Sequence, residues 1–316
     1  MKPKIRIDFS DFWGNFRKCD NFFWNLLSKR FDLELSTDPD FLIYSNRLTH
    51  VHRVHNCVKI FFTPESYAPD WRECDYAFTC RYLDDPRHMR LPLYVVYGPP
   101  ENLVRTGSEN WEAVLASKKE FCAFVVGKGT RERPDRRAEF FHKLSRYKKV
   151  DSAGGFLNNM GSNVPYVGGA KVEFLRPYKF NIAFENAVVT GYTTEKIVEP
   201  MQARCLPVYR GSPRVNEEFN TASFLNYHDF AGDEALIEEI IALDRDEAKY
   251  LERLKQPNFI NNQPNEFYDE ERLLNQFEKI FSQPITPVSQ RRPLFFFGRW
   301  ILVKRNRPPL RKNASG

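Results

Sequence analysis

Long apolar runs, paired cysteines and internal repeats are all missing from this sequence of 316 residues. No run approaches the roughly 18 consecutive apolar residues that indicate a membrane-spanning helix. The six cysteines include no C-x-x-C pair, so they indicate neither a zinc knuckle nor a disulfide framework. The amino-terminal residues pass directly into an alternating strand pattern, without the apolar core of a signal peptide. We therefore expect a globular, cytoplasmic protein.

Acidic residues are absent from residues 282–316, and this stretch carries the excess positive charge of the chain. The formal net charge is +6, and residues 291–312 contain eight Lys or Arg residues, so removing those eight charges leaves −2. The rest of the chain is therefore close to neutral, and its charge gives no support for nucleic-acid binding.

The basic stretch also mixes cations with aromatic residues, reading P-L-F-F-F-G-R-W-I-L-V-K-R over residues 293–305. A basic amphipathic segment of this composition is typical of one that lies on an anionic membrane. The alternatives are a disordered basic end and a segment packed on the body of the protein. We predict that residues 286–316 form a tail that contacts the inner face of the cytoplasmic membrane.

Strand and helix patterns alternate along the chain in two series, which predicts two α/β domains joined by a helical segment at residues 98–118. In the first series we expect strands at 4–9, 40–45, 57–62, 76–80 and 91–97 and a helix at 21–31. In the second series we expect strands at 121–126, 178–184, 206–209 and 224–227, and helices at 135–147, 233–243, 246–255 and 266–281. The predicted domains are residues 1–118 and 119–265, followed by a C-terminal helix at 266–285 and the tail.

The stretch from residue 178 to residue 215 carries the most chemistry. A strand at 178–184 ends at Glu185 and Asn186, and a helix follows that Thr193 or Thr194 can cap. Ligands of open α/β sheets bind beyond the carboxyl ends of the strands, and helix N-termini favour phosphate groups. The sequence therefore predicts a phosphate-bearing ligand at this connection.

The same stretch resembles the signature of the α-1,3-fucosyltransferases of glycosyltransferase family 10. The matching segments are F-N-I-A-F-E-N at 180–186, Y-T-T-E-K at 192–196 and P-V-Y-R-G-S at 207–212. The resemblance covers residues 60–285 and implies a GT-B fold, in which two Rossmann-like domains face a cleft. It implies that the first domain binds the acceptor and the second binds GDP-fucose. One departure is Pro200, which removes a backbone hydrogen bond to Lys196 within a helix that the family usually continues unbroken.

The resemblance also implies a catalytic base and an arginine that binds the donor. Glu65, just after the strand at 57–62, matches the glutamate that takes the proton of the acceptor hydroxyl. An exposed loop glutamate is the alternative for that position. Arg137 keeps the family's spacing of ten residues before Tyr147, and a guanidinium suits phosphate oxygens. Its neighbour Arg136 could take this role instead.

Four further residues are implied to bind the donor. Lys196 would contact the diphosphate, because a cation in the first turn of a helix is otherwise unfavourable for the helix dipole. Glu195 would accept hydrogen bonds from ribose hydroxyls, and a helix-cap acid is the alternative. Tyr192 and Asn186 would hold the diphosphate or the sugar, with core packing as the alternative for Tyr192.

Two motifs are similar to metal sites. His50, His52 and His55 form one of them, but we interpret them as exposed loop or strand histidines, because strand spacing brings no acid into register. Asp38-Pro39-Asp40 is similar to a metal-binding D-x-D motif, but a turn before a strand is the simpler interpretation. With Arg137 and Lys196 available to offset the charge of the leaving group, we expect that no divalent metal is required.

Together these features predict an inverting α-1,3-fucosyltransferase that uses GDP-fucose. The implied acceptor is N-acetylglucosamine in a lactosamine-type glycan, such as an O-antigen-like part of lipopolysaccharide, and the implied role is Lewis antigen synthesis. Two alternatives remain. One is a GT-B glycosyltransferase with another linkage or donor, for example an α-1,4-fucosyltransferase. The other is a non-catalytic protein that binds a nucleotide or a glycan.

Overall fold

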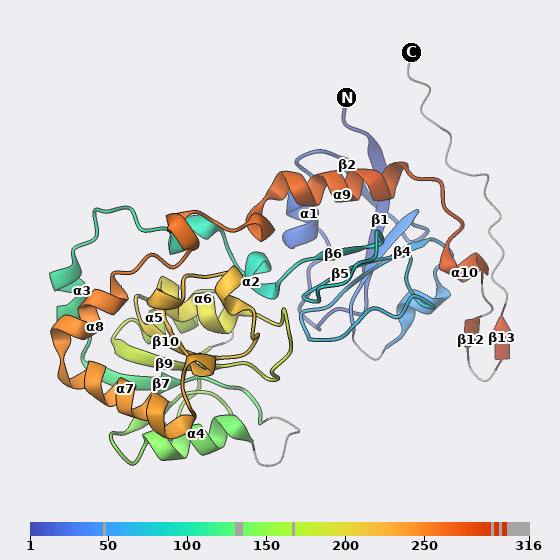
Figure 1. Cartoon of the computed structure of the whole chain (residues 1–316). Helices are drawn as coiled ribbons and strands as arrows, with labels where there is room; N and C mark the ends of the chain where they lie inside the picture. The colour runs from blue at the N-terminus through green and yellow to red at the C-terminus, as the bar shows by residue number, and fades with distance from the viewer. Residues whose placement is uncertain (47–48, 130–134, 166–167, 292–293, 297–298, 302–316) are drawn as a thin grey trace. The chain divides into compact units, whose positions relative to one another are not determined.

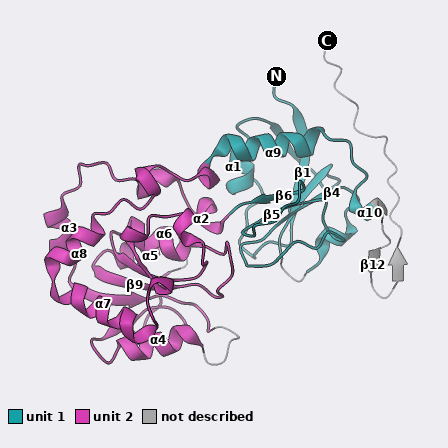
Figure 2. Ribbon diagram, viewed as in Figure 1, with its two compact units in different colours: residues 1–91, 269–316 teal, residues 92–268 magenta. Residues whose placement is uncertain are grey.

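The chain divides into two compact units, and the second is inserted into the first (Figure 2). Unit 1 comprises Met1–Leu91 and Asp269–Gly316, and unit 2 comprises Pro92–Tyr268. The computed structural model describes residues 1–46, 49–129, 135–165, 168–291, 294–296 and 299–301 (Figure 1). The chain therefore leaves unit 1, builds the whole of unit 2 and returns to complete unit 1.

Unit 1 is built on a six-stranded parallel sheet with the order β2-β1-β3-β4-β5-β6. Its strands are β1 (Lys4–Ser10), β2 (Asp32–Leu35), β3 (Phe41–Tyr44), β4 (Val58–Phe62), β5 (Tyr76–Thr79) and β6 (His88–Arg90). Four of these strands, β1, β3, β4 and β5, were predicted from the sequence. The two edge strands were not, because each has only three or four residues and neither is buried along its length.

Helices α1 (Phe22–Leu27) and α9 (Glu270–Ser282) lie side by side over one face of this sheet (Figure 1). The ring of Phe277, on α9, stacks on Phe78 at 4.6 Å between centroids and meets Phe23 edge to face. The ring of Phe281 lies 4.6 Å from that of Phe41. Aromatic side chains from the end of the chain thus close the core of unit 1, and the helix predicted at 266–281 is confirmed for most of its length.

One predicted strand is wrong. Residues 91–97 contain the single helical turn α2 (Leu93–Val96), which Pro92 precedes. Pro92 has no backbone N–H to donate to a sheet ladder. The buried residues of this stretch include Leu91, Tyr94 and Val95. Their i, i+3, i+4 spacing is that of a helix and not the alternation of a strand.

Unit 2 contains a five-stranded parallel sheet with the order β11-β10-β9-β7-β8. Its strands are β7 (Glu120–Phe124), β8 (Val150–Ser152), β9 (Tyr178–Phe184), β10 (Leu206–Arg210) and β11 (Leu225–Asn226). Its longer helices are α3 (Trp111–Ser117), α4 (Arg136–Leu144), α5 (Ala170–Leu175), α6 (Glu195–Gln202), α7 (Asp233–Arg245) and α8 (Glu247–Leu254). Helix α3 lies in the predicted helical segment at 98–118, and α6 is the helix predicted to be capped by Thr193 or Thr194. Of the strands and helices just given, β8 and α5 have no counterpart in the prediction.

Both faces of this second sheet are covered by helices (Figure 1). Side chains of α4, α7 and α8 join the large apolar cluster on one face, and residues of α5 and of the segment after α6 join a smaller cluster on the other. Parallel strands buried on both faces define a doubly wound, Rossmann-like sheet. Unit 1 has the same parallel arrangement, so the α/β class predicted from the sequence is confirmed for both halves.

The predicted tail at residues 286–316 lies largely outside the described residues. Its described part contains the short helix α10 (Val288–Arg291) and the strands β12 (Leu294–Phe296) and β13 (Arg299–Ile301), which pair antiparallel. The backbone N–H of Val288 donates to the carboxylate of Asp75, within unit 1. Among the residues that the structure describes, no helix combines the length and the apolar character needed to cross a membrane.

Candidate active site

The candidate site in unit 2 is built where β9 and β10 end. The backbone N–H of Glu185, the first residue after β9, donates to the carbonyl of Arg210 at 2.7 Å, so the two strand ends stay paired. A Cβ atom at Gly211 would lie 2.5 Å from Cγ of Glu185 and 2.2 Å from the hydroxyl of Tyr209. Only glycine fits at that close approach, which explains the glycine of the P-V-Y-R-G-S segment.

Glu185 links the end of β9 to the beginning of α6. Its side chain is buried, and its carboxylate accepts from the backbone N–H of Thr194 at 2.7 Å. The hydroxyl of Thr194 lies 2.7 and 2.9 Å from the two carboxylate oxygens. Thr194 is also the N-cap of α6, which settles the choice that the sequence left between two threonines. The sequence places Glu185 at the strand end but does not indicate this role for it.

Lys196 lies in the first turn of α6, between two carboxylates. Its Nζ is 3.2 Å from Oε2 of Glu185 and 3.4 Å from Oε1 of Glu195, and it donates to the hydroxyl of Thr194 at 3.1 Å. Burial lowers the pKa of Lys196, but the charges of Glu185 and Glu195 outweigh burial and raise that pKa well above its ordinary value. The two carboxylates therefore favour the charged form of Lys196, and 15% of its side chain is exposed.

The unfavourable position of Lys196 near the positive end of the helix dipole does not need a bound ligand to offset it, contrary to the prediction from the sequence. In the structure the carboxylates of Glu185 and Glu195 already offset it. The pKa of Glu195 is lowered, because Lys196 and Lys171 outweigh the effect of burial. The ammonium group is thus fixed at the carboxyl edge of the sheet by side chains of the chain itself.

Arg137 and Asn186 are brought together by the structure. Nη1 of Arg137, in the first turn of α4, donates to Oδ1 of Asn186 at 2.9 Å. The guanidinium is buried and also donates to Asp135, the N-cap of α4, and to the carbonyl of Lys128. The alternative, Arg136, forms an ion pair with Asp233 at 2.9 Å instead. Arg137 is therefore the arginine that reaches the loop after β9.

Tyr192 is buried in the same connection, with 2% of its surface exposed. Its backbone carbonyl accepts from the hydroxyl of Tyr209 at 3.4 Å, which ties the loop to the end of β10. Gly191, which precedes it, has a φ of +86°, a conformation that glycine adopts at little cost. Tyr192 thus has the packing role that is the alternative to donor binding.

Glu65 belongs to unit 1. It follows β4 by three residues, so it lies at the carboxyl edge of that sheet, and it is half-buried. Its backbone N–H donates to the hydroxyl of Thr63 at 3.1 Å, and Nε of Arg81 donates to the carbonyl of Ser66 at 3.0 Å. The loop that carries Glu65 is therefore held by hydrogen bonds on both sides of the residue.

The interpretation of the histidine segment is wrong for His52. Val51–Val54 forms the 3-10 helix η1, and His52 is buried. Its Nδ1 lies 2.9 Å from the carboxylate of Asp11, and its Nε2 lies 2.7 Å from that of Glu73. Burial lowers the pKa of His52, but these two hydrogen bonds outweigh burial and raise it. Strand spacing did not indicate either acid, because the segment is not a strand.

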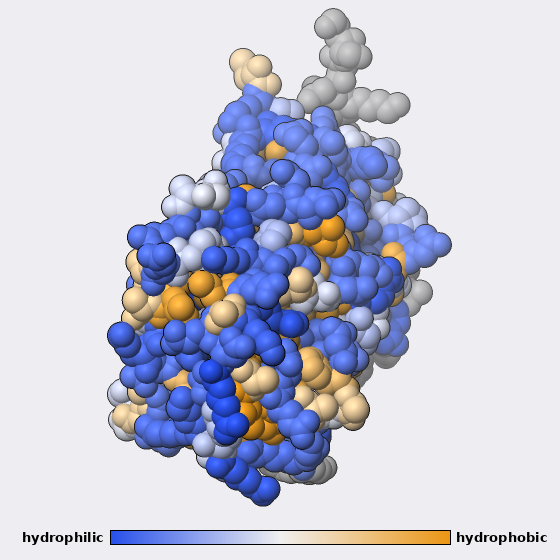
Figure 3. All heavy atoms as spheres, turned by 60° about the vertical axis from the view of Figure 1, so that its left-hand side comes forward, coloured by the Kyte–Doolittle hydropathy of each residue, from blue (hydrophilic) through white to orange (hydrophobic). Residues whose placement is uncertain are grey.

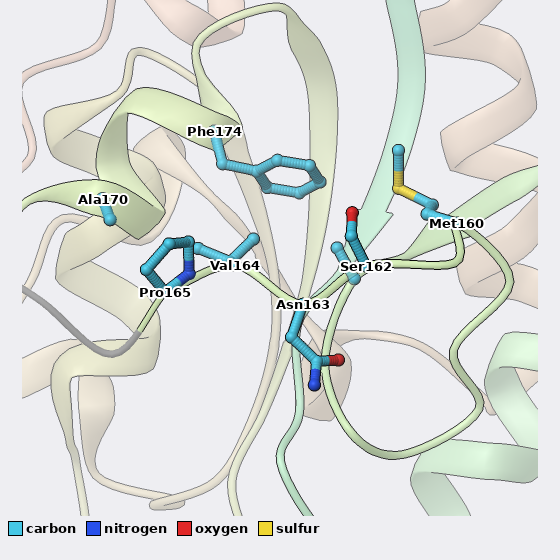
Figure 4. Close-up of a pocket in the computed structure, with 8 residues that line it drawn as sticks. Met160, Ser162, Asn163, Val164, Pro165, Ala170 and Phe174 are labelled. Carbon is cyan, nitrogen blue, oxygen red and sulfur yellow. The ribbon is translucent and has the colours of Figure 1, made fainter.

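A small pocket of about 240 Å³ lies beside α5 in unit 2. Figure 4 shows the ring of Phe174 projecting from α5 toward the loop that carries Met160 and Ser162. None of the residues predicted to bind the donor lines it. On the face shown in Figure 3, hydrophilic residues predominate among those described, and apolar ones occur in small separate groups.

Two parallel α/β units, with polar side chains gathered at the carboxyl edge of the sheet in unit 2, agree with the GT-B class predicted from the sequence. Comparison with family models agrees with this class. The model of the α-(1,3)-fucosyltransferase FucT N-terminal domain matches residues 7–97, and that of the glycosyltransferase family 10 (fucosyltransferase) C-terminal part matches residues 115–275. The chain belongs to glycosyltransferase family 10.

Individual relatives and solved structures point the same way. The chain is 29% identical to the α-(1,3)-fucosyltransferase FucT of Helicobacter pylori over 89% of its own length and 65% of that protein. It is 33% identical to the 4-galactosyl-N-acetylglucosaminide 3-α-L-fucosyltransferase FUT6 of Pongo pygmaeus, over 43% of this chain and 37% of that one. It thus spans less than two thirds of the length of these relatives. A crystal structure of an α1,3-fucosyltransferase with GDP-fucose matches with a TM-score of 0.73 at 26% identity, covering 91% of this chain and 93% of that one.

The link between Glu185 and Thr194 is open to a stability test. Thr194→Val keeps the side-chain shape but removes the hydroxyl that caps α6 and contacts a buried carboxylate. We expect it to lower the free energy of unfolding of unit 2 by about 1–3 kcal/mol. Thr194→Ser, which keeps the hydroxyl, is the matched control. Chemical denaturation followed by circular dichroism measures both, and a valine variant as stable as the serine variant would contradict this assignment.

Proposed function

We propose that the chain is an inverting α-1,3-fucosyltransferase that transfers L-fucose from GDP-fucose to N-acetylglucosamine of a lactosamine-type glycan. The observation that carries the proposal is the cation at the carboxyl edge of the sheet in unit 2. Lys196 is fixed there in the first turn of α6, within the Y-T-T-E-K segment that the family signature contains. The match to a fucosyltransferase crystallised with GDP-fucose supports the choice of donor.

The donor would bind through charge and through the N-terminal end of α6. The diphosphate of GDP is an anion, and the ammonium of Lys196 together with the first N–H groups of the helix suits it. Arg137 adds a second positive charge, and its hydrogen bond orients Asn186 at the same strand end. Glu195 and Tyr192 complete the proposed donor set, with Glu195 accepting hydrogen bonds from ribose hydroxyls.

The reaction would be a single displacement. Glu65 takes the proton of the acceptor hydroxyl while that oxygen attacks the anomeric carbon of fucose. The bond from that carbon to the phosphate oxygen breaks, and GDP leaves with the electron pair. Lys196 and Arg137 stabilise the charge that develops on the leaving group, so we propose that this step needs no divalent metal. Attack opposite the leaving group inverts the configuration without a covalent intermediate on the enzyme.

The acceptor is chosen by similarity to named relatives. The H. pylori relative is an α-(1,3)-fucosyltransferase, and the FUT6 relative is named for a 4-galactosyl-N-acetylglucosaminide acceptor. A lactosamine acceptor agrees with both names. We propose, from the family resemblance alone, that it belongs to an O-antigen-like part of lipopolysaccharide and is fucosylated in Lewis antigen synthesis. A panel of nucleotide sugars and disaccharides separates this proposal from a glycosyltransferase with another linkage or donor. Faster turnover with a different nucleotide sugar would overturn the choice of donor.

Glu65→Gln distinguishes a catalyst from a protein that only binds. We expect the rate of transfer to fall by about 10²–10⁴-fold, because glutamine cannot take a proton. The affinity for GDP, measured by calorimetry, should stay nearly unchanged. Glu34→Gln is the matched control, since Glu34 is an exposed carboxylate on β2 of the same unit, and it should retain full activity. Full transfer by the Glu65 variant would remove Glu65 from the proposed mechanism.

Lys196 is tested by GDP binding. Lys196→Met should weaken GDP binding by about tenfold or more, because the main charge facing the diphosphate is lost. This single change also leaves the carboxylate of Glu185 buried without its cation, which destabilises the fold. The double variant Glu185→Gln/Lys196→Met removes both charges and should fold but still bind GDP weakly. Lys255→Ala, at an exposed position after α8, is the control. Wild-type affinity in the double variant would refute the role of Lys196.

We also propose that the basic tail holds the enzyme at the inner face of the cytoplasmic membrane, in a peripheral position. The support is the sequence of residues 291–312, with eight cations and no acid, interleaved with aromatic residues. Deleting residues 292–316 should move the protein from the pellet to the supernatant when it is sedimented with anionic vesicles. Activity on soluble lactosamine should persist. Equal binding of both forms to these vesicles would exclude the tail as the membrane contact.

A further inference from the structure

A cluster of two histidines and a glutamate lies in unit 1, apart from every residue assigned above. Among the described residues, His50, His52 and Glu73 form the group whose ligand atoms all lie within 4.8 Å of one another. His52 lies in η1 and His50 is the residue before it. Glu73 lies in the segment before β5. Two imidazoles and one carboxylate are the ligand types that Zn²⁺ uses in open, three-residue sites.

Buried contacts orient the central ligand from behind. Nδ1 of His52 donates to the carboxylate of Asp11 at 2.9 Å, so Nε2 faces Glu73. Asp11 has a fully buried side chain and also accepts from the backbone N–H groups of Val51 and His52. The ring of Tyr44 stacks on that of His52 at 4.1 Å. A carboxylate behind a ligating histidine fixes its tautomer and its direction, which is the usual outer-shell arrangement at zinc sites.

Arg53 holds the glutamate, and the second histidine has an unusual backbone conformation. Arg53 donates to both carboxylate oxygens of Glu73, from Nη2 to Oε1 and from Nε to Oε2. Oε2 is also the oxygen that contacts Nε2 of His52. His50 has a left-handed backbone, with φ of +54°, which is uncommon for a residue other than glycine. Without a metal, the proton between Nε2 of His52 and Oε2 of Glu73 balances the charge of the cluster. Once that proton has left, the two carboxylates outnumber the one guanidinium, and a cation can balance the remaining negative charge.

We propose that His50, His52 and Glu73 bind a divalent transition-metal ion, Zn²⁺ in the first instance, with Asp11 as the positioning residue behind His52. The ion replaces the proton between Nε2 of His52 and Oε2 of Glu73, and that proton is released to the solvent. Three protein ligands leave a fourth position for water. The site belongs to unit 1 and is independent of the diphosphate-binding residues proposed in unit 2.

Co²⁺ is the probe that reports the ligands directly. The full-length chain, without an affinity tag and with Cys19→Ser to remove its exposed thiol, is first freed of metal by a chelator. Addition of Co²⁺ should give visible absorption bands that saturate at one ion per chain and lack the near-ultraviolet bands of a cobalt–thiolate bond. One equivalent of Zn²⁺ should abolish these bands. Absent visible bands, or strong thiolate bands, would overturn the proposal.

Variants then locate the ion. His50→Asn removes an imidazole but keeps a residue type that tolerates the left-handed backbone, and it should weaken Co²⁺ binding by about tenfold or more. Asp11→Asn should weaken it by about 10–100-fold without removing a ligand. His55→Gln, next to η1 but outside the cluster, is the matched control and should bind as the parent does. Equal affinity in His50→Asn and His55→Gln would refute this site.

Two further measurements test the site, and the first needs no variant in the cluster. X-ray absorption of the zinc-loaded parent should show two imidazoles with oxygen ligands and no sulfur. Zn²⁺ should also raise the melting temperature of the parent and of His55→Gln. A sulfur-dominated spectrum, or a stabilisation that His50→Asn retains, would assign the bound zinc to other groups.

Discussion

The buried contact between Glu185 and Lys196 is the constraint on which the second unit's site depends. A carboxylate at the end of a covered strand is costly unless a cation and hydrogen bonds accompany it. Thr194 supplies the hydrogen bonds and Lys196 the cation, and both stand at the start of α6. The first turn of α6 must therefore lie in space beside the end of β9, although a loop separates them in the sequence. Its N-terminus and its ammonium group are placed at the carboxyl edge before any ligand arrives.

The sequence was sufficient for β9, α6 and β10, because the signals for each element lie within it. Strand residues, a threonine cap and an apolar stretch ending in glycine follow one another in one short stretch. The sequence patterns did not predict the structure correctly where an element is short or where its pattern fits both a strand and a helix. Strand β2 has three exposed residues of four and shows no alternation. The apolar run at residues 91–97 has the composition of a strand, but it contains the helical turn α2. Pro92 precedes that turn, and the adjacent residues Tyr94 and Val95 are both buried.

The site residues divide in the same way. Lys196, Glu195 and Asn186 are adjacent to recognisable elements, so their positions followed from the motif. The role of Glu185 did not, since it depends on its contacts with Thr194 and Lys196 in the folded chain. It depends also on the close approach of Gly211, the residue after β10. His52 is a stronger case, because its partners Asp11 and Glu73 lie 41 and 21 residues away in the sequence. Contacts of that separation are set by the folded sheet, and no local pattern encodes them.

The return of the chain to unit 1 has a consequence for how the protein is made. Phe277 and Phe281 cover rings on the sheet of unit 1, and they belong to the second of its two segments. On the ribosome, all six strands of that sheet emerge long before α9 does. Unit 2 is complete at Tyr268 and can consolidate first. Unit 1 can then be completed only after unit 2, against the usual order from the N-terminus. The face of its sheet that α9 covers stays open in the nascent chain until α9 arrives.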